Sequence, residues 1–181
     1  LASLVSNGDD GAKSAAMAAL DAEAYVTAAA GLQVLAELDP ATAAEAATKL
    51  ENTENDAILG ALAGIYAASG DVSKLPFFEK QMMEVDGYDA LSLLDAYRKL
   101  LAKADQPVAQ AGILKMKELA LNQSTSPWRR LAATKAVSDW REELKKSGDT
   151  EKVTMLGEII KEVKSKETEP QLLQIYTGYG N

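Results

Sequence analysis

The sequence predicts an all-α fold, an α-α superhelix of about four antiparallel helix pairs of the HEAT or TPR type. Hydrophobic residues make up 47% of the 181 residues, yet only two Phe and two Trp occur, and such an alanine-rich composition favours close-packed helices. Apolar residues recur at three- and four-residue spacings, with no useful length of period-two alternation. Turn signals recur at the period of two-helix repeats. The length suits a single domain over residues 1–181.

Four turn signals organise the chain, each an Asp with Gly, Pro or Ala beside it. They are Asp39, Asp71, Asp105 and Asp149, and successive signals lie 32, 34 and 44 residues apart. Gly suits the left-handed residue after a helix, Pro tolerates the first helical turn, and Asp accepts hydrogen bonds from free N–H groups of the next helix. The spacings predict four helical hairpins over residues 22–166.

Each hairpin is expected to have one helix before its aspartate and one after it. The first helices are predicted over residues 22–38, 56–69, 88–104 and 127–147, the last beginning with the start signal Ser126-Pro127. The second helices are predicted over 41–51, 72–85, 108–122 and 151–166. Residues 1–21, with a short helix over 11–20, are expected to be the remnant of a preceding repeat. Residues 167–181 are expected to form a short helix or an extended tail that caps the last repeat.

Apolar stripes support these helices, because their spacing places them on one helical face. The range 88–104 carries such a stripe at Ala90, Leu93, Leu94, Tyr97, Leu100, Leu101 and Ala104. In the last hairpin the two opposing stripes are Ala133, Val137, Trp140 and Leu144, and Val153, Leu156, Ile160 and Val163.

Composition and charge exclude several classes of function. The chain contains neither His nor Cys, which excludes the commonest zinc ligands, Cys or His nucleophiles, and disulfides. The net charge of −8 argues against binding to a phosphate backbone, and no apolar run is long enough to span a membrane. Residues 1–100 hold 6 basic and 16 acidic side chains, whereas residues 101–181 hold 13 basic and 11 acidic side chains. We therefore expect an acidic N-terminal part, no catalytic, cofactor-binding or metal-binding residue, and no preference for one cellular compartment.

Trp128, Arg129 and Arg130 form the most conspicuous cluster of candidate surface contacts. One interpretation is a clamp for an anion or a peptide carboxylate, because arginine forms paired hydrogen bonds with carboxylates. The other, which we favour, is a first-turn Trp packed on the preceding repeat with two solvated arginines.

Phe77 is the remaining candidate contact. Residues Leu75, Phe78, Met82 and Val85 fall on helical spacing and fit a core stripe, which leaves Phe77 outside that stripe. We expect Phe77 to make a contact between repeats.

Acidic pairs such as Glu142-Glu143 and Asp9-Asp10 could suggest acid–base chemistry or a calcium site. Adjacent residues on a helix point about 100° apart, so these carboxylates are not expected to converge. The charged residues between Glu158 and Lys166 are predicted to form a solvated face.

Three segments together resemble a known family: AELDPATA from Ala36, IYAASGD from Ile65 and LALNQSTSPWRRLAA from Leu119. They are similar to the HEAT-like C-terminal region of bacterial zinc aminopeptidases of the aminopeptidase N type, over about residues 22–148. In that family a separate catalytic domain carries an H-E-x-x-H zinc motif and a Gly-x-Met-Glu-Asn motif. Neither occurs here, so the resemblance implies zinc in a parent enzyme and transfers no catalytic residue. The start at Leu1 without an initiator Met leads us to expect a piece of a longer protein.

The resemblance implies a non-catalytic domain that packs on the catalytic domain of a parent aminopeptidase and restricts the access of peptides to its zinc site. The alternative is a stand-alone HEAT- or TPR-like scaffold that binds a protein or peptide. Its acidic N-terminal part would then prefer a basic partner. Neither hypothesis involves nucleic acid or membrane insertion.

Overall fold

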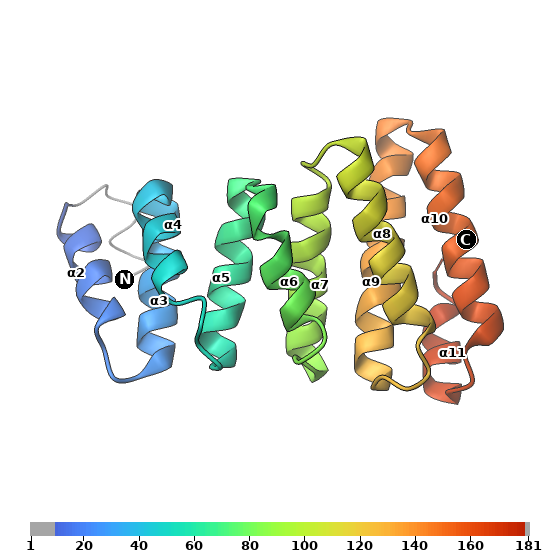
Figure 1. Ribbon diagram of the computed structural model, residues 1–181, viewed down its shortest axis with the longest axis horizontal. Coiled ribbons are helices and arrows are strands. Elements are labelled where there is room, and N and C mark those ends of the chain that lie inside the picture. Colours follow the sequence, from blue (N-terminus) through green and yellow to red (C-terminus); the bar gives the residue numbers. More distant parts are fainter. Residues whose placement is uncertain (1–9, 180–181) are drawn as a thin grey trace. The chain divides into compact units, whose positions relative to one another are not determined.

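The computed structural model describes residues 10–179. These residues form ten α-helices and one short 3-10 helix, with no strand among them (Figure 1). The predicted all-α fold is confirmed. The chain divides into two compact units, an N-terminal unit (Leu1–Phe77) and a C-terminal unit (Phe78–Asn181), and each is described separately.

The helices lie close to their predicted positions. Their bounds are α2 Asp10–Leu20, α3 Tyr25–Leu38, α4 Pro40–Lys49, α5 Asp56–Ser69, η1 Val72–Lys74, α6 Leu75–Gln81, α7 Gly87–Leu101, α8 Gln106–Leu121, α9 Pro127–Ser147, α10 Thr150–Lys166 and α11 Pro170–Tyr176. The predictions of 56–69 and 127–147 match to the residue. The single helix predicted over 72–85 is wrong, because Pro76 has no N–H to continue the turn that begins at Val72. The α-helix instead begins at Leu75 and ends at Gln81.

All four marker aspartates cap the helix that follows them, as predicted. Each side chain accepts a hydrogen bond of 3.0–3.1 Å from a backbone N–H in the first turn of that helix. Gly70 and Gly148, which precede two of these aspartates, have left-handed φ angles of 72° and 81°. At these four positions the local sequence therefore predicts where the next helix begins.

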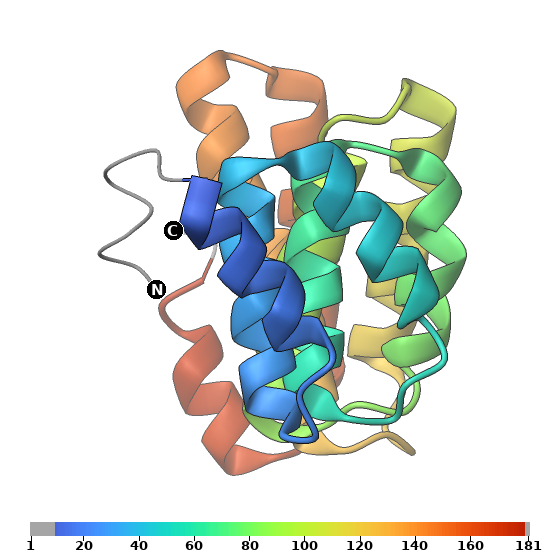
Figure 2. The ribbon, with the colours of Figure 1, turned by 90° about the vertical axis from the view of Figure 1, so that its left-hand side faces the viewer.

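In the N-terminal unit, α3 lies between α2 and α5, and α4 packs on α3 and α5 (Figure 1). Figure 2 shows α2 running antiparallel to α3. These two helices approach closely at Gly31, where an added Cβ would lie 2.7 Å from the Ala16 carbonyl oxygen and 2.9 Å from Ala19 Cβ. Only glycine fits at this crossing without a backbone shift.

In the C-terminal unit, α9 packs on α7, α8 and α10, and α8 also contacts α10 (Figure 1). The predicted stripe of α7 is buried from Ala90 to Leu101. Ala104 is only half-buried because α7 ends at Leu101. The stripes of α9 and α10 are buried except at Leu144 and Val153, which are half-buried.

Candidate functional site

The predicted cluster Trp128, Arg129 and Arg130 lies in the first turn of α9. Ser126 caps this helix, because its Oγ accepts from the Arg129 N–H at 3.3 Å, and it also donates to Asp86 Oδ1 at 2.5 Å. Consecutive side chains on a helix point about 100° apart. The three candidate side chains consequently enter three different surroundings.

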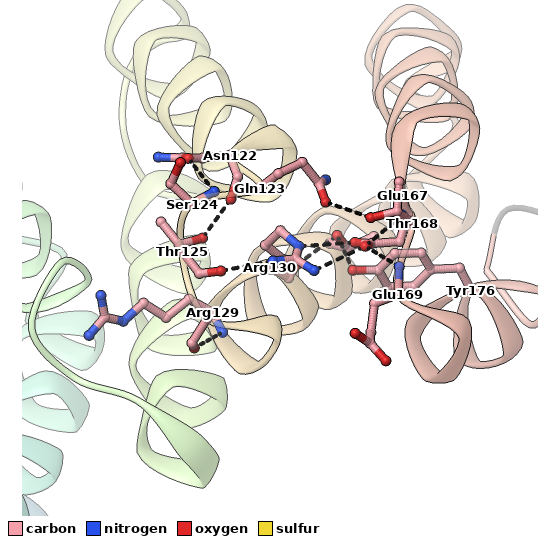
Figure 3. Close-up of polar contacts among 12 residues, drawn as sticks. Asn122, Gln123, Ser124, Thr125, Arg129, Arg130, Glu167, Thr168, Glu169 and Tyr176 are labelled. Carbon is pink, nitrogen blue, oxygen red and sulfur yellow. Dashed lines mark hydrogen bonds and ion pairs between the residues drawn. The ribbon is translucent and has the colours of Figure 1, made fainter.

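Arg130 points inward and forms a buried ion pair with Glu167 (Figure 3). Its Nε lies 3.1 Å from Glu167 Oε2 and its Nη2 lies 3.0 Å from Oε1, while Nη1 donates to the Thr125 carbonyl at 2.8 Å. The residue is only 5% exposed, so the expectation of solvated arginines is wrong at this position. Position 130 shares a helical face with the buried residues Thr134 and Val137. The cost of burying the Arg130 charge is offset by the carboxylate of Glu167, which lies in the C-terminal segment 167–181.

Glu167 is held as a carboxylate by the groups around it (Figure 3). Burial raises its pKa, but hydrogen bonds from Arg130 and from the backbone amides of Glu169 and Thr168 outweigh burial, so the pKa lies below its ordinary value. Both amides lie 2.9 Å from Oε1. The clamp interpretation predicted paired hydrogen bonds from arginine to the carboxylate of a ligand. Arg130 instead makes these paired hydrogen bonds to Glu167, a carboxylate of the same chain.

The tail that supplies Glu167 also packs on α9. Tyr176, at the end of α11, is fully buried, and its hydroxyl is hydrogen-bonded to Thr134 Oγ1 at 3.2 Å. Leu172, one helical turn before Tyr176 in α11, is also buried. Of the two alternatives predicted for 167–181, a short helix or an extended tail, the structure has the short helix α11. The segment is attached by both apolar and ionic contacts.

Arg129 binds the chain segment that precedes α7. Its Nε donates to the Val85 carbonyl and its Nη2 to the Glu84 carbonyl, each at 2.9 Å. These carbonyls follow α6 and have no place in a helical hydrogen-bond ladder. Arg129 and Arg130 therefore bind different segments, and the structure does not bring them together as one clamp.

Trp128 faces outward and packs on Tyr88, in the first turn of α7. The ring centroids lie 5.3 Å apart with a tilt of 45°, and Trp128 is 42% and Tyr88 77% exposed. Trp128 thus contacts an earlier helix, as the favoured interpretation predicted. Tyr88 was missed, although each aromatic residue is the second residue after its N-cap, Asp86 or Ser126. We call Tyr88 and Trp128 the aromatic pair.

Phe77 contacts α5 of its own unit. Its ring and that of Tyr66 form a T-shaped pair, with centroids 5.3 Å apart and planes at 83°. The Tyr66 hydroxyl donates to Glu51 Oε1 at 2.5 Å, and Lys74 pairs with the same carboxylate. Phe78, Met82 and Val85 are buried, as the predicted core stripe requires, whereas Leu75 is half-buried.

A second buried arginine, Arg98, links α7 to α9 and was not identified from the sequence. It is 3% exposed and contacts Asp95 Oδ1 at 2.8 Å and Glu143 Oε2 at 2.5 Å. Glu142 instead pairs with Lys145 at 2.8 Å. The prediction that Glu142 and Glu143 do not converge is confirmed, while the side chains of Asp9 and Asp10 lie outside the described residues.

Some of the charged side chains between Glu158 and Lys166 form ion pairs or hydrogen bonds. Glu162 pairs with Lys117 of α8 at 2.7 Å and with Lys166 at 2.6 Å. Glu158, Lys161 and Lys166 are exposed, as predicted for a solvated face, and Glu162 and Lys164 are half-buried. The half-buried positions are those that reach other segments of the C-terminal unit.

Within residues 10–179, no three carboxylates come together in a group that could hold a metal ion. No helix of that same range combines the length and the apolar character needed to cross a membrane. No protein-family model, curated protein or solved structure matches this chain.

Proposed function

We propose that this chain is a non-catalytic helical-repeat domain of a zinc aminopeptidase, and that it packs against the catalytic domain and restricts the access of peptides to the zinc site. The observation that carries the proposal is the order of helix packing within each unit. In the N-terminal unit, the first helix of one hairpin packs on the first helix of the next, α3 on α5. In the C-terminal unit α7 packs on α9, and the second helices α8 and α10 also meet. Stacking of this kind is typical of HEAT-type solenoids.

The three segments that resemble the aminopeptidase family contain helix caps and the turns between helices. AELDPATA contains the Asp39 cap between α3 and α4, and IYAASGD contains the left-handed Gly70 and the Asp71 cap. The segment from Leu119 builds the turn between α8 and α9 and presents Trp128 of the aromatic pair. Exposed Trp and Tyr side chains are common anchors of protein interfaces, which suits a domain that functions by packing on another.

The first test is to read the coding sequence upstream of Leu1. The proposal expects an H-E-x-x-H motif in the same reading frame, and its absence overturns the proposal. If the motif is present, the full enzyme is compared with a form that lacks residues 10–179. We expect kcat/KM to rise for long peptides and to change little for a single-residue chromogenic substrate, because only the long peptides are obstructed. Equal changes for both substrates contradict a role in access.

A second candidate function, a stand-alone scaffold for a basic protein or peptide, is favoured by the charge of the N-terminal part. Residues 1–100 carry 16 acidic and 6 basic side chains. Electrostatic attraction would act mainly on the association rate. Charge reversal of acidic residues within 37–56 is expected to slow the binding of a Lys-rich probe peptide and to reduce its salt dependence. Binding that is unaffected by both salt and charge reversal contradicts this function.

A further inference from the structure

A groove beside α10 in the C-terminal unit combines three cationic side chains with one carboxylate. It is lined by Arg141 of α9, by Lys161, Lys164 and Glu158 of α10, and by Tyr179 after α11. The formal charge of these groups is three positive less one negative, or +2. From this groove we infer a binding site for a small phosphate-type dianion, independent of the function proposed above.

The central group of the site is the Arg141 guanidinium, which lacks acceptors. Its Nε and Nη1 are buried and have no hydrogen-bond partner among the described residues. Glu142 Oε1 lies 3.5 Å from Nη1 without forming a hydrogen bond, and that oxygen is already paired with Lys145 at 2.8 Å. Buried donors are nearly always satisfied in folded proteins. A turn of the side chain toward the groove would let a bound oxyanion supply the acceptors that these buried donors lack.

Gly157 leaves room for the guanidinium to lie against α10. A Cβ at this position would lie 3.2 Å from Arg141 Nε and 3.6 Å from Nη2. Any larger residue at position 157 would therefore crowd Nε and displace the guanidinium. Gly157 lies inside α10, where glycine is less favourable than alanine, so its effect is to leave space beside Arg141.

The two lysines have donors available for a bound anion. Lys164 Nζ donates to the Tyr179 carbonyl oxygen, and an ammonium group has three donors in total. Lys161 is exposed and lies one helical turn from Gly157. Arginine and lysine together provide the charge and the directed hydrogen bonds typical of phosphate recognition.

The experiment titrates the full chain with inorganic phosphate at constant ionic strength, with chloride as the balancing anion. NMR follows the Arg141 Nε–Hε signal and the Gly157 backbone amide. We expect saturable shifts of both signals in the millimolar range. Acetate at the same concentrations is expected to shift them less, because it carries a single charge. Absence of saturation, or acetate binding as tight as phosphate binding, overturns the inference.

Matched variants separate the site from general charge attraction. Arg141→Gln is expected to weaken phosphate binding about 10-fold or more, and Gly157→Ala to weaken it with every charge retained. Lys117→Gln removes one positive charge outside the groove and is expected to leave affinity within about two-fold. Equal losses in Arg141→Gln and Lys117→Gln, or unchanged binding in Gly157→Ala, overturn the site. If Arg141→Gln does not fold, Gly157→Ala and Lys117→Gln decide the question.

Discussion

The two units hold their helices together by different means. In the described part of the N-terminal unit, every fully buried side chain except that of Tyr66 is apolar, and many are alanine. In the C-terminal unit, Arg98, Arg130, Glu167 and three uncharged polar residues are buried. Small apolar residues set how closely helices approach, but they discriminate weakly between partners. A buried ion pair requires its two charges to stay together, since either charge without its partner is costly.

This difference predicts different vulnerabilities. We expect the N-terminal unit to be sensitive to added volume and the C-terminal unit to loss of a charge partner. Both Trp residues, Trp128 and Trp140, belong to the C-terminal unit, so Trp fluorescence reports its unfolding. Amide hydrogen exchange in α3 and α5 reports the N-terminal unit.

The largest effect is expected for Glu167→Ala. This substitution leaves the Arg130 guanidinium buried and unpaired, at a cost of about 3–5 kcal/mol in the free energy of unfolding. Urea unfolding followed by Trp fluorescence measures this loss. The double substitution Arg130→Met with Glu167→Leu is expected to recover most of it, because no buried charge remains. A loss below about 1 kcal/mol in Glu167→Ala would show that the pair does not hold the tail.

A smaller effect is expected for Gly31→Ala in the N-terminal unit. The new methyl group would collide with the Ala16 carbonyl and push α2 from α3, at a cost of about 1–3 kcal/mol. Faster hydrogen exchange in α3 measures this loss. Gly64→Ala in α5 is the control, because a Cβ there meets nothing within 4 Å. The control is expected to be neutral or stabilising by up to about 1 kcal/mol, and equal losses in both variants would contradict close packing at Gly31.

Helix caps are expected to contribute equally in the two units. Asp39 and Asp149 each cap a helix and each pair with one lysine, Lys13 or Lys152. Replacement of either aspartate by Ala is expected to cost about 1 kcal/mol, and replacement by Asn much less. Hydrogen exchange in α4 and α10 compares the two. A clear difference between units would mean that caps, and not only buried charges, distinguish them.

The smallest effect is expected from mild acidification. Because the pKa of Glu167 is lowered in the folded chain, its contribution is present above the unfolded-state pKa and is lost as pH falls. Between pH 6 and pH 4.5 the unfolded chain takes up protons first, which removes at most about 0.3 kcal/mol through this residue. Urea unfolding at both pH values should show this extra loss in the unchanged chain and not in the Arg130→Met, Glu167→Leu variant. An identical pH response in the two would contradict the lowered pKa.

Most of the helices could be predicted because their signals are local. The four aspartate caps, the left-handed Gly70 and Gly148 and the Ser126-Pro127 start all act within about one turn of the helix ends that they define. The error over 72–85 came from starting a single helix directly after Asp71, although Pro76 has no N–H to continue the turn that begins at Val72. The candidate site was predicted less well, since Arg129 and Arg130 were grouped by adjacency although adjacent helical residues point in different directions.

The sequence by itself determined where most helices begin and end and which of their faces are apolar, since these depend on neighbouring residues. Only the tertiary structure decided that Arg130 is buried and Trp128 exposed, because the Arg130–Glu167 pair joins residues 37 positions apart. The Arg98–Glu143 pair likewise spans 45 positions. A charge in the sequence is compatible with solvent or with a buried partner, and its free energy depends on which carboxylate the folded chain brings beside it.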